Sequence, residues 1–272
     1  MNIAIQGIRG SYHHAVADIL FPAAKITTCT NFSDIPPLLI EKQADAAVMA
    51  IENSIAGAIL PNYALIDEYN LQITGEYYLP IQHQLMALKG QSLTDIKEVW
   101  SHPMALEQCR KFFRNHPDIK LIEEKDTAEV ALIIQQKQLM GIAAIAGKNA
   151  AQIYSLNIIA SDIQTHPENY TRFVLLENAS FQETTEFNKI SLKFTLPHQV
   201  GGLFHILEVL NDNNLSMSKI QSLPIVDKPW EYAFFVDVHV TEEKLFYQAE
   251  KEIVKLVNEI KVLGQYKNNR PT

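Results

Sequence analysis

The chain consists of two stretches that differ in how apolar and polar residues follow one another. In the first, which extends to about residue 178, short apolar runs alternate with segments of helical periodicity. The run 46–51 is apolar throughout, which is typical of a strand buried on both faces. Alternation of strands with helices predicts an α/β fold with a largely parallel sheet or sheets. The strands expected here are residues 3–5, 46–51, 85–88, 98–100, 120–122, 142–145 and 173–176, with a helix over 15–21.

The second stretch begins near residue 188, after a polar, aperiodic segment at 178–186 that is typical of a linker. Apolar and polar residues then alternate over 190–196, which predicts a half-buried strand. The resulting βαββαβ order predicts an antiparallel sheet with two helices on one face, the ferredoxin-like plan. Its expected elements are strand 190–196, helix 203–210, strands 215–222 and 232–240, helix 244–260 and strand 262–266.

Composition narrows the class of protein. A length of 272 residues fits about two domains, and 47% hydrophobic with 20% charged residues is typical of a globular protein. The net charge of -8 provides no basic surface for nucleic acid, so an anionic ligand must be held by local groups. Two isolated cysteines indicate a reducing compartment without disulfides. With neither a leader-like nor a membrane-spanning apolar run, we expect a cytoplasmic protein.

The most informative segment is 169–173, where a polar loop becomes an apolar run. It places the hydroxyl of Thr171 beside the guanidinium of Arg172. A hydroxyl can donate a hydrogen bond, and a guanidinium binds carboxylates through paired N–H groups. The pair therefore suggests a site that holds an organic acid and donates to one of its oxygens. A strand edge with a solvated arginine explains the same residues, and the segment alone leaves both readings open.

Four junctions between an apolar run and a helix carry small hydroxyl or amide residues, at 7–11, 52–54, 101–103 and 126–129. Singly, each is an ordinary helix cap. In α/β sheets, however, the carboxyl ends of parallel strands meet at one crevice, and the helix N-termini there attract anions. Together the junctions predict a cup for a compact polyanion, with Thr171 and Arg172 on its rim.

Other chemistries lack their signatures in this sequence. The histidines and cysteines have no metal-ligand spacing, and no dinucleotide fingerprint, P-loop or G-x-S-x-G elbow occurs. We therefore expect neither a metal nor a cofactor.

The ordered motifs resemble those of the prephenate dehydratase family over essentially the whole chain, and the second stretch resembles an ACT regulatory domain. The matching segments are 10–12, 51–57, 101–109, 126–128, 143–146 and 169–173. The resemblance implies a catalytic domain over 1–178 with two lobes, similar to type 2 periplasmic binding proteins. Lobe one would comprise about 1–77 and 161–178, lobe two about 80–158, and the ACT domain 188–267.

The resemblance also implies an activity, the conversion of prephenate to phenylpyruvate, water and carbon dioxide. Aromatisation drives this reaction, so no cofactor is needed. Thr171 would be the catalytic residue that donates to the leaving hydroxyl. Arg172 would clamp a carboxylate or support the cleft. Further substrate contacts are expected from Asn53, Ser54, Ser11, Ser101, Thr127, Asn169 and Phe173.

The sequence departs from the family in the regulatory domain. The usual Glu-Ser-Arg-Pro is Gln221-Ser222-Leu223-Pro224, and the usual Gly-Ala-Leu is Gly201-Gly202-Leu203. These changes bring feedback by phenylalanine into question. If phenylalanine binds, we expect it at an interface between two ACT domains, which makes a homodimer or homotetramer the expected assembly. The effector would contact Gly201, Gly202, Leu203, Gln221 and Ser222.

Two other functions fit the same motifs. The first is the same chemistry on arogenate, which carries an ammonium group in addition. The second is a non-catalytic sensor with a binding-protein-like cleft, although binding alone does not need a donor such as Thr171 beside Arg172.

Overall fold

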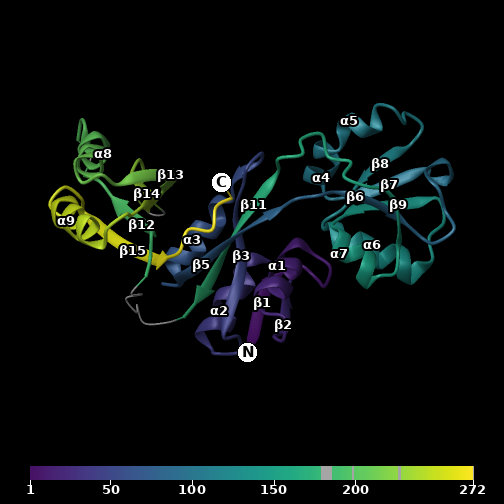
Figure 1. The fold of residues 1–272 in the computed structure, drawn as a ribbon, viewed down its shortest axis with the longest axis horizontal. Helices are drawn as coiled ribbons and strands as arrows, with labels where there is room; N and C mark the ends of the chain where they lie inside the picture. Colours follow the sequence, from purple (N-terminus) through teal and green to yellow (C-terminus); the bar gives the residue numbers. More distant parts are fainter. Residues whose placement is uncertain (179–185, 198, 226–227, 272) are drawn as a thin grey trace. The chain divides into compact units, whose positions relative to one another are not determined.

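The computed structural model describes residues 1–178, 186–197, 199–225 and 228–271, and the chain divides into two compact units (Figure 1). Unit 1 comprises Met1–Ile35, Asn53–Ala56 and Leu79–Thr171. Unit 2 comprises Pro36–Glu52, Gly57–Tyr78 and Arg172–Thr272. The expected linker at 178–186 falls largely outside the described residues.

Unit 1 begins with a parallel βαβ arrangement. Strand β1 (Asn2–Gln6) pairs with β2 (Lys25–Cys29), and α1 (Tyr12–Leu20) connects them. The side chain of Ser11 caps α1 by accepting from the backbone N–H of His14 at 3.2 Å. A short 3-10 turn, η1 (Phe32–Asp34), follows β2.

The rest of unit 1 is a five-stranded sheet in the order β10-β6-β9-β7-β8. Strands β7, β8 and β9 run parallel, as predicted, whereas β6 pairs antiparallel with both β9 and β10. The strands are β6 (Gln84–Ala87), β7 (Glu98–Ser101), β8 (Lys120–Glu123), β9 (Ile142–Ala146) and β10 (Asn157–Ala160).

Alternate residues of this sheet enter two separate cores, because successive strand side chains point to opposite faces. Leu85 and Ile145 pack with helices α4 and α5, while Met86 and Ala144 pack with α6 and α7. Figure 1 shows the two helix pairs on opposite sides of the sheet. The helices are α4 (Pro103–Gln108), α5 (Arg110–Phe113), α6 (Thr127–Lys137) and α7 (Lys148–Ile153), and η2 (Leu93–Asp95) precedes β7.

Unit 2 contains the strands β3, β11 and β5, which lie in that order, with the short β4 paired to β3. Residues 46–51 of β3 are buried without exception, which confirms the strand predicted from the apolar run. The elements are α2 (Ile35–Ile40), β3 (Ala46–Asn53), β4 (Gly57–Ala58), α3 (Leu60–Glu68), β5 (Gln72–Pro80) and β11 (Tyr170–Glu177).

The C-terminal part of unit 2 confirms the predicted βαββαβ order. Its four strands form an antiparallel sheet in the order β13-β14-β12-β15, and the two helices lie next to each other against it (Figure 1). Leu192 and Phe194 face a core shared with Ile206 and Phe246 of the helices. The elements are β12 (Lys189–Thr195), α8 (Gly202–Asp212), β13 (Ser216–Pro224), β14 (Tyr232–His239), α9 (Glu243–Ile253) and β15 (Glu259–Tyr266).

Some element bounds differ from the prediction. The helix expected to reach residue 260 ends at Ile253, because the N–H of Asn258 donates to the carbonyl of Thr195 and β15 begins at the next residue. Strands β2, β5 and β10 were not among the predicted elements. Sheet pairing overrides the local signal in β2, whose central residues are the polar pair Thr27 and Thr28.

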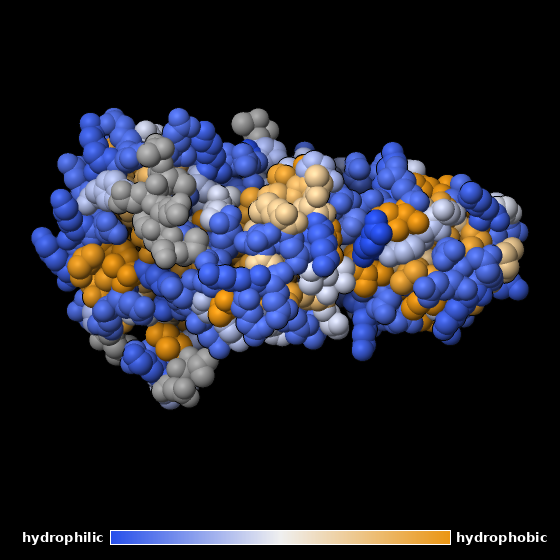
Figure 2. All heavy atoms as spheres, turned by 90° about the horizontal axis from the view of Figure 1, so that it is seen from below, coloured by the Kyte–Doolittle hydropathy of each residue, from blue (hydrophilic) through white to orange (hydrophobic). Residues whose placement is uncertain are grey.

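The face of the molecule drawn in Figure 2 is mostly hydrophilic and carries separate patches of hydrophobic residues. Within the described ranges, no helix is long and apolar enough to cross a membrane.

Gly264 in β15 provides a test of the packing in unit 2. A Cβ added there would overlap the carbonyl oxygen of Ile73 and lie 2.8 Å from its Cβ, so the backbones would have to separate. We expect Gly264→Ala to lower the free energy of unfolding by about 3 kcal/mol, as overpacking against a backbone does. Denaturant titration measures the change. At Gly202, whose added Cβ would have no neighbour closer than 3.7 Å, the same substitution should have little effect, and equal losses at both sites would contradict the packing argument.

Candidate active site

The hydroxyl of Thr171 lies within a hydrogen-bonded group of amides at the ends of β3 and β11. Nδ2 of Asn53 donates to Oγ1 of Thr171 at 3.0 Å and to Oδ1 of Asn169 at 2.7 Å. Oδ1 of Asn53 accepts from the backbone N–H groups of Ile55 and Ala56 at 3.0 and 2.9 Å. These two backbone donors fix which end of the amide faces Thr171. Oγ1 of Thr171 is therefore an acceptor toward Asn53, and its own proton is left to donate elsewhere.

Neighbouring contacts hold the same two segments together. The N–H of Ser54 donates to the carbonyl of Tyr170 at 2.8 Å, and Oγ of Ser54 accepts from the N–H of Tyr170 at 2.9 Å. Asn169 is completely buried, and its Nδ2 donates to Oε1 of Gln108 at 3.0 Å. The structure thus brings together four of the predicted site residues: Asn53, Ser54, Asn169 and Thr171.

The predicted residues at the other junctions make local contacts. Ser11 caps α1, and Thr127 begins α6 directly after Asp126, which caps that helix through the N–H groups of Ala128 and Glu129. Ser101 is fully buried, and its Oγ donates to the carbonyl of Ile145 at 2.7 Å, so its hydroxyl hydrogen is engaged inside the sheet.

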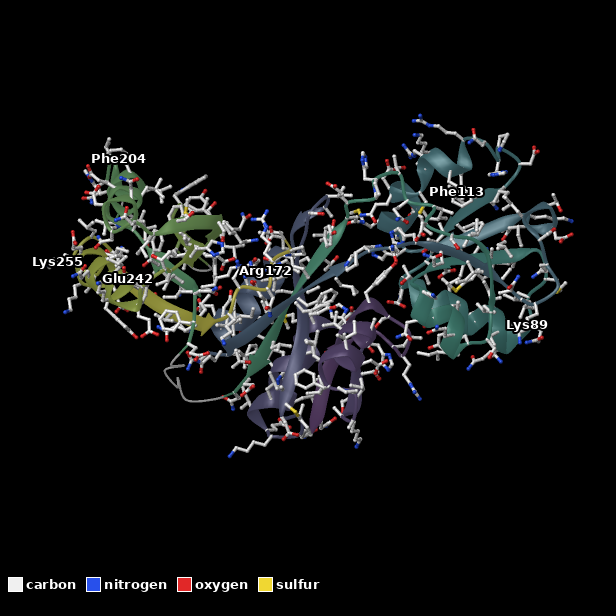
Figure 3. All side chains as sticks on the ribbon, in the orientation of Figure 1. Lys89, Phe113, Arg172, Phe204, Glu242 and Lys255 are labelled. Carbon is white, nitrogen blue, oxygen red and sulfur yellow. The ribbon has the colours of Figure 1, made fainter. Side chains whose placement is uncertain are left out.

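Arg172 follows Thr171 in β11, yet its side chain lies in a different environment (Figure 3). Arg172 is 2% exposed, and Phe173, the next residue, is part of the core. The guanidinium donates from Nε to Glu76 at 2.8 Å, from Nη2 to the hydroxyl of Tyr266 at 2.8 Å, and from Nη1 to Asp237. All three guanidinium nitrogens therefore have acceptors within the protein. Of the two roles considered for Arg172, this geometry favours the supporting one.

A second buried cation joins the same acidic groups. Lys189 is 1% exposed, and its Nζ donates to the two carboxylate oxygens of Glu76 at 2.8 and 3.1 Å. Ser191 connects Asp237 with the hydroxyl of Tyr266. Burial disfavours the ionised form of Asp237, but the charges of Arg172 and Lys189 outweigh burial and lower its pKa. Burial also lowers the pKa of Lys189, and the adjacent charge of Arg172 acts in the same direction.

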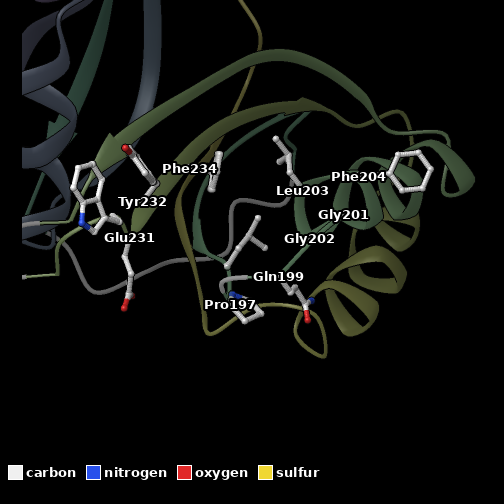
Figure 4. A pocket seen from close by; sticks show the side chains of 11 residues that line it. Pro197, Gln199, Gly201, Gly202, Leu203, Phe204, Glu231, Tyr232 and Phe234 are labelled. Carbon is white, nitrogen blue, oxygen red and sulfur yellow. The ribbon is translucent and has the colours of Figure 1, made fainter.

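The C-terminal domain contains a pocket of about 310 Å³ at the start of α8 (Figure 4). The predicted effector residues Gly201, Gly202 and Leu203 line it. Gln221 and Ser222 do not line the pocket, since they lie in β13 with Nε2 of Gln221 donating to the carbonyl of Ser222. Aromatic side chains complete the lining, among them Trp230, Tyr232 and Phe234.

Several residues of these networks were absent from the predicted site. The only sequence signal that pointed to Gln108 as a site residue is its place in the matching segment 101–109. Asp237 stands between two valines in an apolar strand, where an unpaired carboxylate would be costly, and this placement could have indicated a buried ion pair. Glu76 and Tyr266 lie far apart in sequence from Arg172, and only the folded chain brings them to it.

The chain is similar to known proteins in both sequence and fold. A family model described as prephenate dehydratase matches residues 3–180. The Arabidopsis thaliana protein arogenate dehydratase/prephenate dehydratase 2, chloroplastic, is 33% identical over 98% of this chain and 72% of its own length.

Two solved structures share the fold over nearly their full lengths. Prephenate dehydratase from Arthrobacter aurescens in complex with L-Phe is 26% identical, with a TM-score of 0.87 over 100% of this chain and 92% of its own. GqqA, described as a novel type of quorum quenching acylase, is 25% identical, with a TM-score of 0.90 over 98% of this chain and 97% of its own.

The buried ion network provides a stability test with a pH dependence. We expect Asp237→Asn to lower the free energy of unfolding by about 3–5 kcal/mol at neutral pH, because it leaves a buried cation without its partner charge. The folded-state pKa of Asp237 is depressed, so its contribution is present above the unfolded pKa of about 4 and is lost as the pH falls through the folded value. The difference between the two proteins should therefore shrink below about pH 4.

Thermal unfolding followed at several pH values checks this expectation. Lys267→Gln is the matched control, since it removes an ion pair with Glu186 in which both side chains are more than half exposed. Such surface ion pairs contribute little to the free energy of unfolding. Equal stability of Asp237→Asn and the parent protein at neutral pH would contradict the expected role of the network.

Proposed function

Because the chain belongs to the prephenate dehydratase family, we propose that it converts prephenate to phenylpyruvate, water and carbon dioxide, with Thr171 donating to the leaving hydroxyl. The enzyme is a carbon–oxygen lyase of phenylalanine biosynthesis. The observation that carries the role of Thr171 is the 3.0 Å hydrogen bond from Asn53, whose amide is oriented by two backbone N–H groups.

The reaction has simple requirements. The bond between the ring and its carboxylate breaks, and its electron pair enters the ring as the C–O bond to the hydroxyl breaks on the other side. The hydroxyl leaves as hydroxide, which takes up a proton from solvent to become water. Aromatisation supplies the driving force, so the protein has to hold the substrate and stabilise the departing oxygen. Threonine is a weak acid, and Thr171 therefore acts by a hydrogen bond to the developing charge rather than by full proton transfer.

In this proposal, the other residues that the sequence predicts as substrate contacts divide into those that bind the substrate and those that support the strand β11. Ser54, Asn169, Ser11, Ser101 and Thr127 belong to unit 1 with Thr171, and we assign the substrate carboxylates to residues of this group. The N-terminus of α1 is suited to an anion, whereas the first N–H groups of α6 already donate to the carboxylate of Asp126. Arg172 supports the site by anchoring β11 beside the reacting hydroxyl, and Phe173 anchors the same strand in the core.

We propose the domain organisation that the sequence predicts. The catalytic domain spans 1–178, with lobe one at about 1–77 and 161–178 and lobe two at about 80–158, and an ACT domain spans 188–267. Phenylalanine is the effector, supported by the L-Phe complex of the relative from Arthrobacter aurescens. We further propose that the protein is cytoplasmic. We also propose a homodimer or homotetramer, because paired ACT domains would form the effector site.

Arogenate is the alternative substrate, since the relative from Arabidopsis thaliana carries both names. Side-by-side kinetics on prephenate and arogenate decide between them. The appearance of phenylpyruvate on mixing with prephenate separates both from a non-catalytic sensor.

Removal of the Thr171 hydroxyl tests the proposed mechanism. We expect Thr171→Ala to lower kcat by roughly 10²–10⁴, the usual loss for a positioned donor. Thr171→Ser keeps the hydroxyl and should retain most of the activity. Phenylpyruvate formation measures both variants, and a folded Thr171→Ala protein with near-normal turnover would refute the assignment.

Phenylalanine binding tests the effector site. Isothermal titration calorimetry of the full-length protein should give saturable binding at millimolar phenylalanine or below. Gly201→Val should abolish it, because the φ of +80° at this position disfavours a β-branched residue. Lys255→Gln, at an exposed position after α9, should bind as the parent protein does. No heat at millimolar phenylalanine would rule out the proposed effector.

A further inference from the structure

A buried histidine lies at the far end of the amide network that orients Thr171. We propose that His83, with Tyr12, is a positioning residue for the dehydration: it fixes the amide of Gln108 and, through Asn169 and Asn53, the direction of the Thr171 hydroxyl. The proposal rests on the proposed role of Thr171. Every residue of the network belongs to unit 1.

The direction of each hydrogen bond can be assigned by starting at Asn53. Its Oδ1 accepts from two backbone N–H groups, so its Nδ2 donates to Oδ1 of Asn169. The other end of the Asn169 amide is then an NH₂ group, which faces Gln108 at 3.0 Å. Gln108 must present its carbonyl oxygen there, because an NH₂ group would give two donors facing each other.

This assignment determines the tautomer of His83. Nε2 of His83 lies 2.8 Å from the same Oε1 of Gln108. A carbonyl oxygen can only accept, so Nε2 carries the proton. In the neutral ring Nδ1 is then an acceptor, and the hydroxyl of Tyr12 lies 2.9 Å from it as the donor. The hydroxyl of Tyr12 also lies 3.1 Å from the carbonyl oxygen of Gln82, so its one proton has two acceptors, and Gln108 sets the tautomer that Tyr12 can complement.

The surroundings of His83 hold this arrangement in place. His83 is 2% exposed, and its backbone N–H donates to Oε1 of Gln164 at 2.9 Å. The ring of Tyr12 meets the imidazole edge-on, with 6.0 Å between the centroids. Burial lowers the pKa of His83, while the bond to Gln108 partly opposes that shift, so the neutral ring is the form present at neutral pH.

The opposite tautomer would disturb the whole network. An unprotonated Nε2 would face the carbonyl oxygen of Gln108, and rotation of that amide would bring its NH₂ group against the NH₂ group of Asn169. Asn169 cannot rotate in turn, because Asn53 is held by the backbone. The wrong tautomer would therefore place two acceptors or two NH₂ groups against each other beside Asn169, and a shift of Asn169 would displace the NH₂ group of Asn53 that it binds next to Thr171, although neither His83 nor Tyr12 needs to touch the substrate.

Two substitutions test whether His83 acts through the hydrogen bonds of its ring nitrogens or only by filling space. His83→Leu removes both ring nitrogens, and we expect kcat to fall about 10–100-fold with KM changed by less than about threefold. His83→Gln carries an N–H the same number of bonds from Cα as Nε2, and it should restore most of the lost kcat. A folded His83→Leu protein with the parent's kcat would overturn the proposal.

A double variant tests whether His83 acts through Thr171. If it does, Thr171→Ala combined with His83→Leu should be no slower than Thr171→Ala alone. Losses that multiply would show an independent role and overturn the proposal. A Thr171→Ala protein with normal turnover would instead refute the proposed function of Thr171, so the two failures are distinguishable.

The tautomer itself provides a readout that does not depend on activity. We expect His83 to carry its proton on Nε2. Long-range proton–nitrogen correlation spectra of the full-length protein with isotope-labelled histidine measure this, and the signal that is lost in His83→Gln identifies His83. Tyr12→Phe removes only one hydroxyl and leaves the acceptor Gln108 in place, so the proton should stay on Nε2, while the loss of one of the two hydrogen bonds to the ring should lower kcat several-fold even if His83→Leu fails to fold. A proton on Nδ1 in the parent protein would overturn the proposal.

Discussion

The buried guanidinium of Arg172 is the constraint on which unit 2 depends. A charge at 2% exposure is tolerated only with partners, and Glu76, Asp237 and Tyr266 supply them from β5, β14 and β15. Lys189 adds a second cation that shares Glu76. Strand β11 and the C-terminal sheet therefore contribute to one network, in which the loss of a single carboxylate leaves a cation unpaired.

The two adjacent residues Thr171 and Arg172 serve different purposes because successive side chains of a strand point to opposite faces. Thr171 enters a group of neutral amides, where the direction of each hydrogen bond is determined by its neighbour. Arg172 enters a group of charges, where ion pairing fixes the strand. A reacting hydroxyl gains from this separation, since its orientation is set by the amides while its position is set by the ion pairs.

The C-terminal domain combines this anchoring with a ligand pocket. Gly201 adopts a φ of +80° at the start of α8, and the turn it forms brings residues 201–203 to the pocket wall. Gln221 and Ser222 of β13 lie outside that wall.

Much of this protein follows from local sequence. Apolar periodicity predicts β3 and the βαββαβ order, because burial of a strand or helix face requires it, and the ordered set of motifs along the chain resembles that of the family. The tertiary structure decides the rest. The end of α9 and the presence of β2 follow from sheet pairing with distant strands. The partners of Arg172 and the hydrogen bonds that link Asn53, Asn169 and Gln108 join segments far apart in sequence, and no local pattern records which amide will face which acceptor.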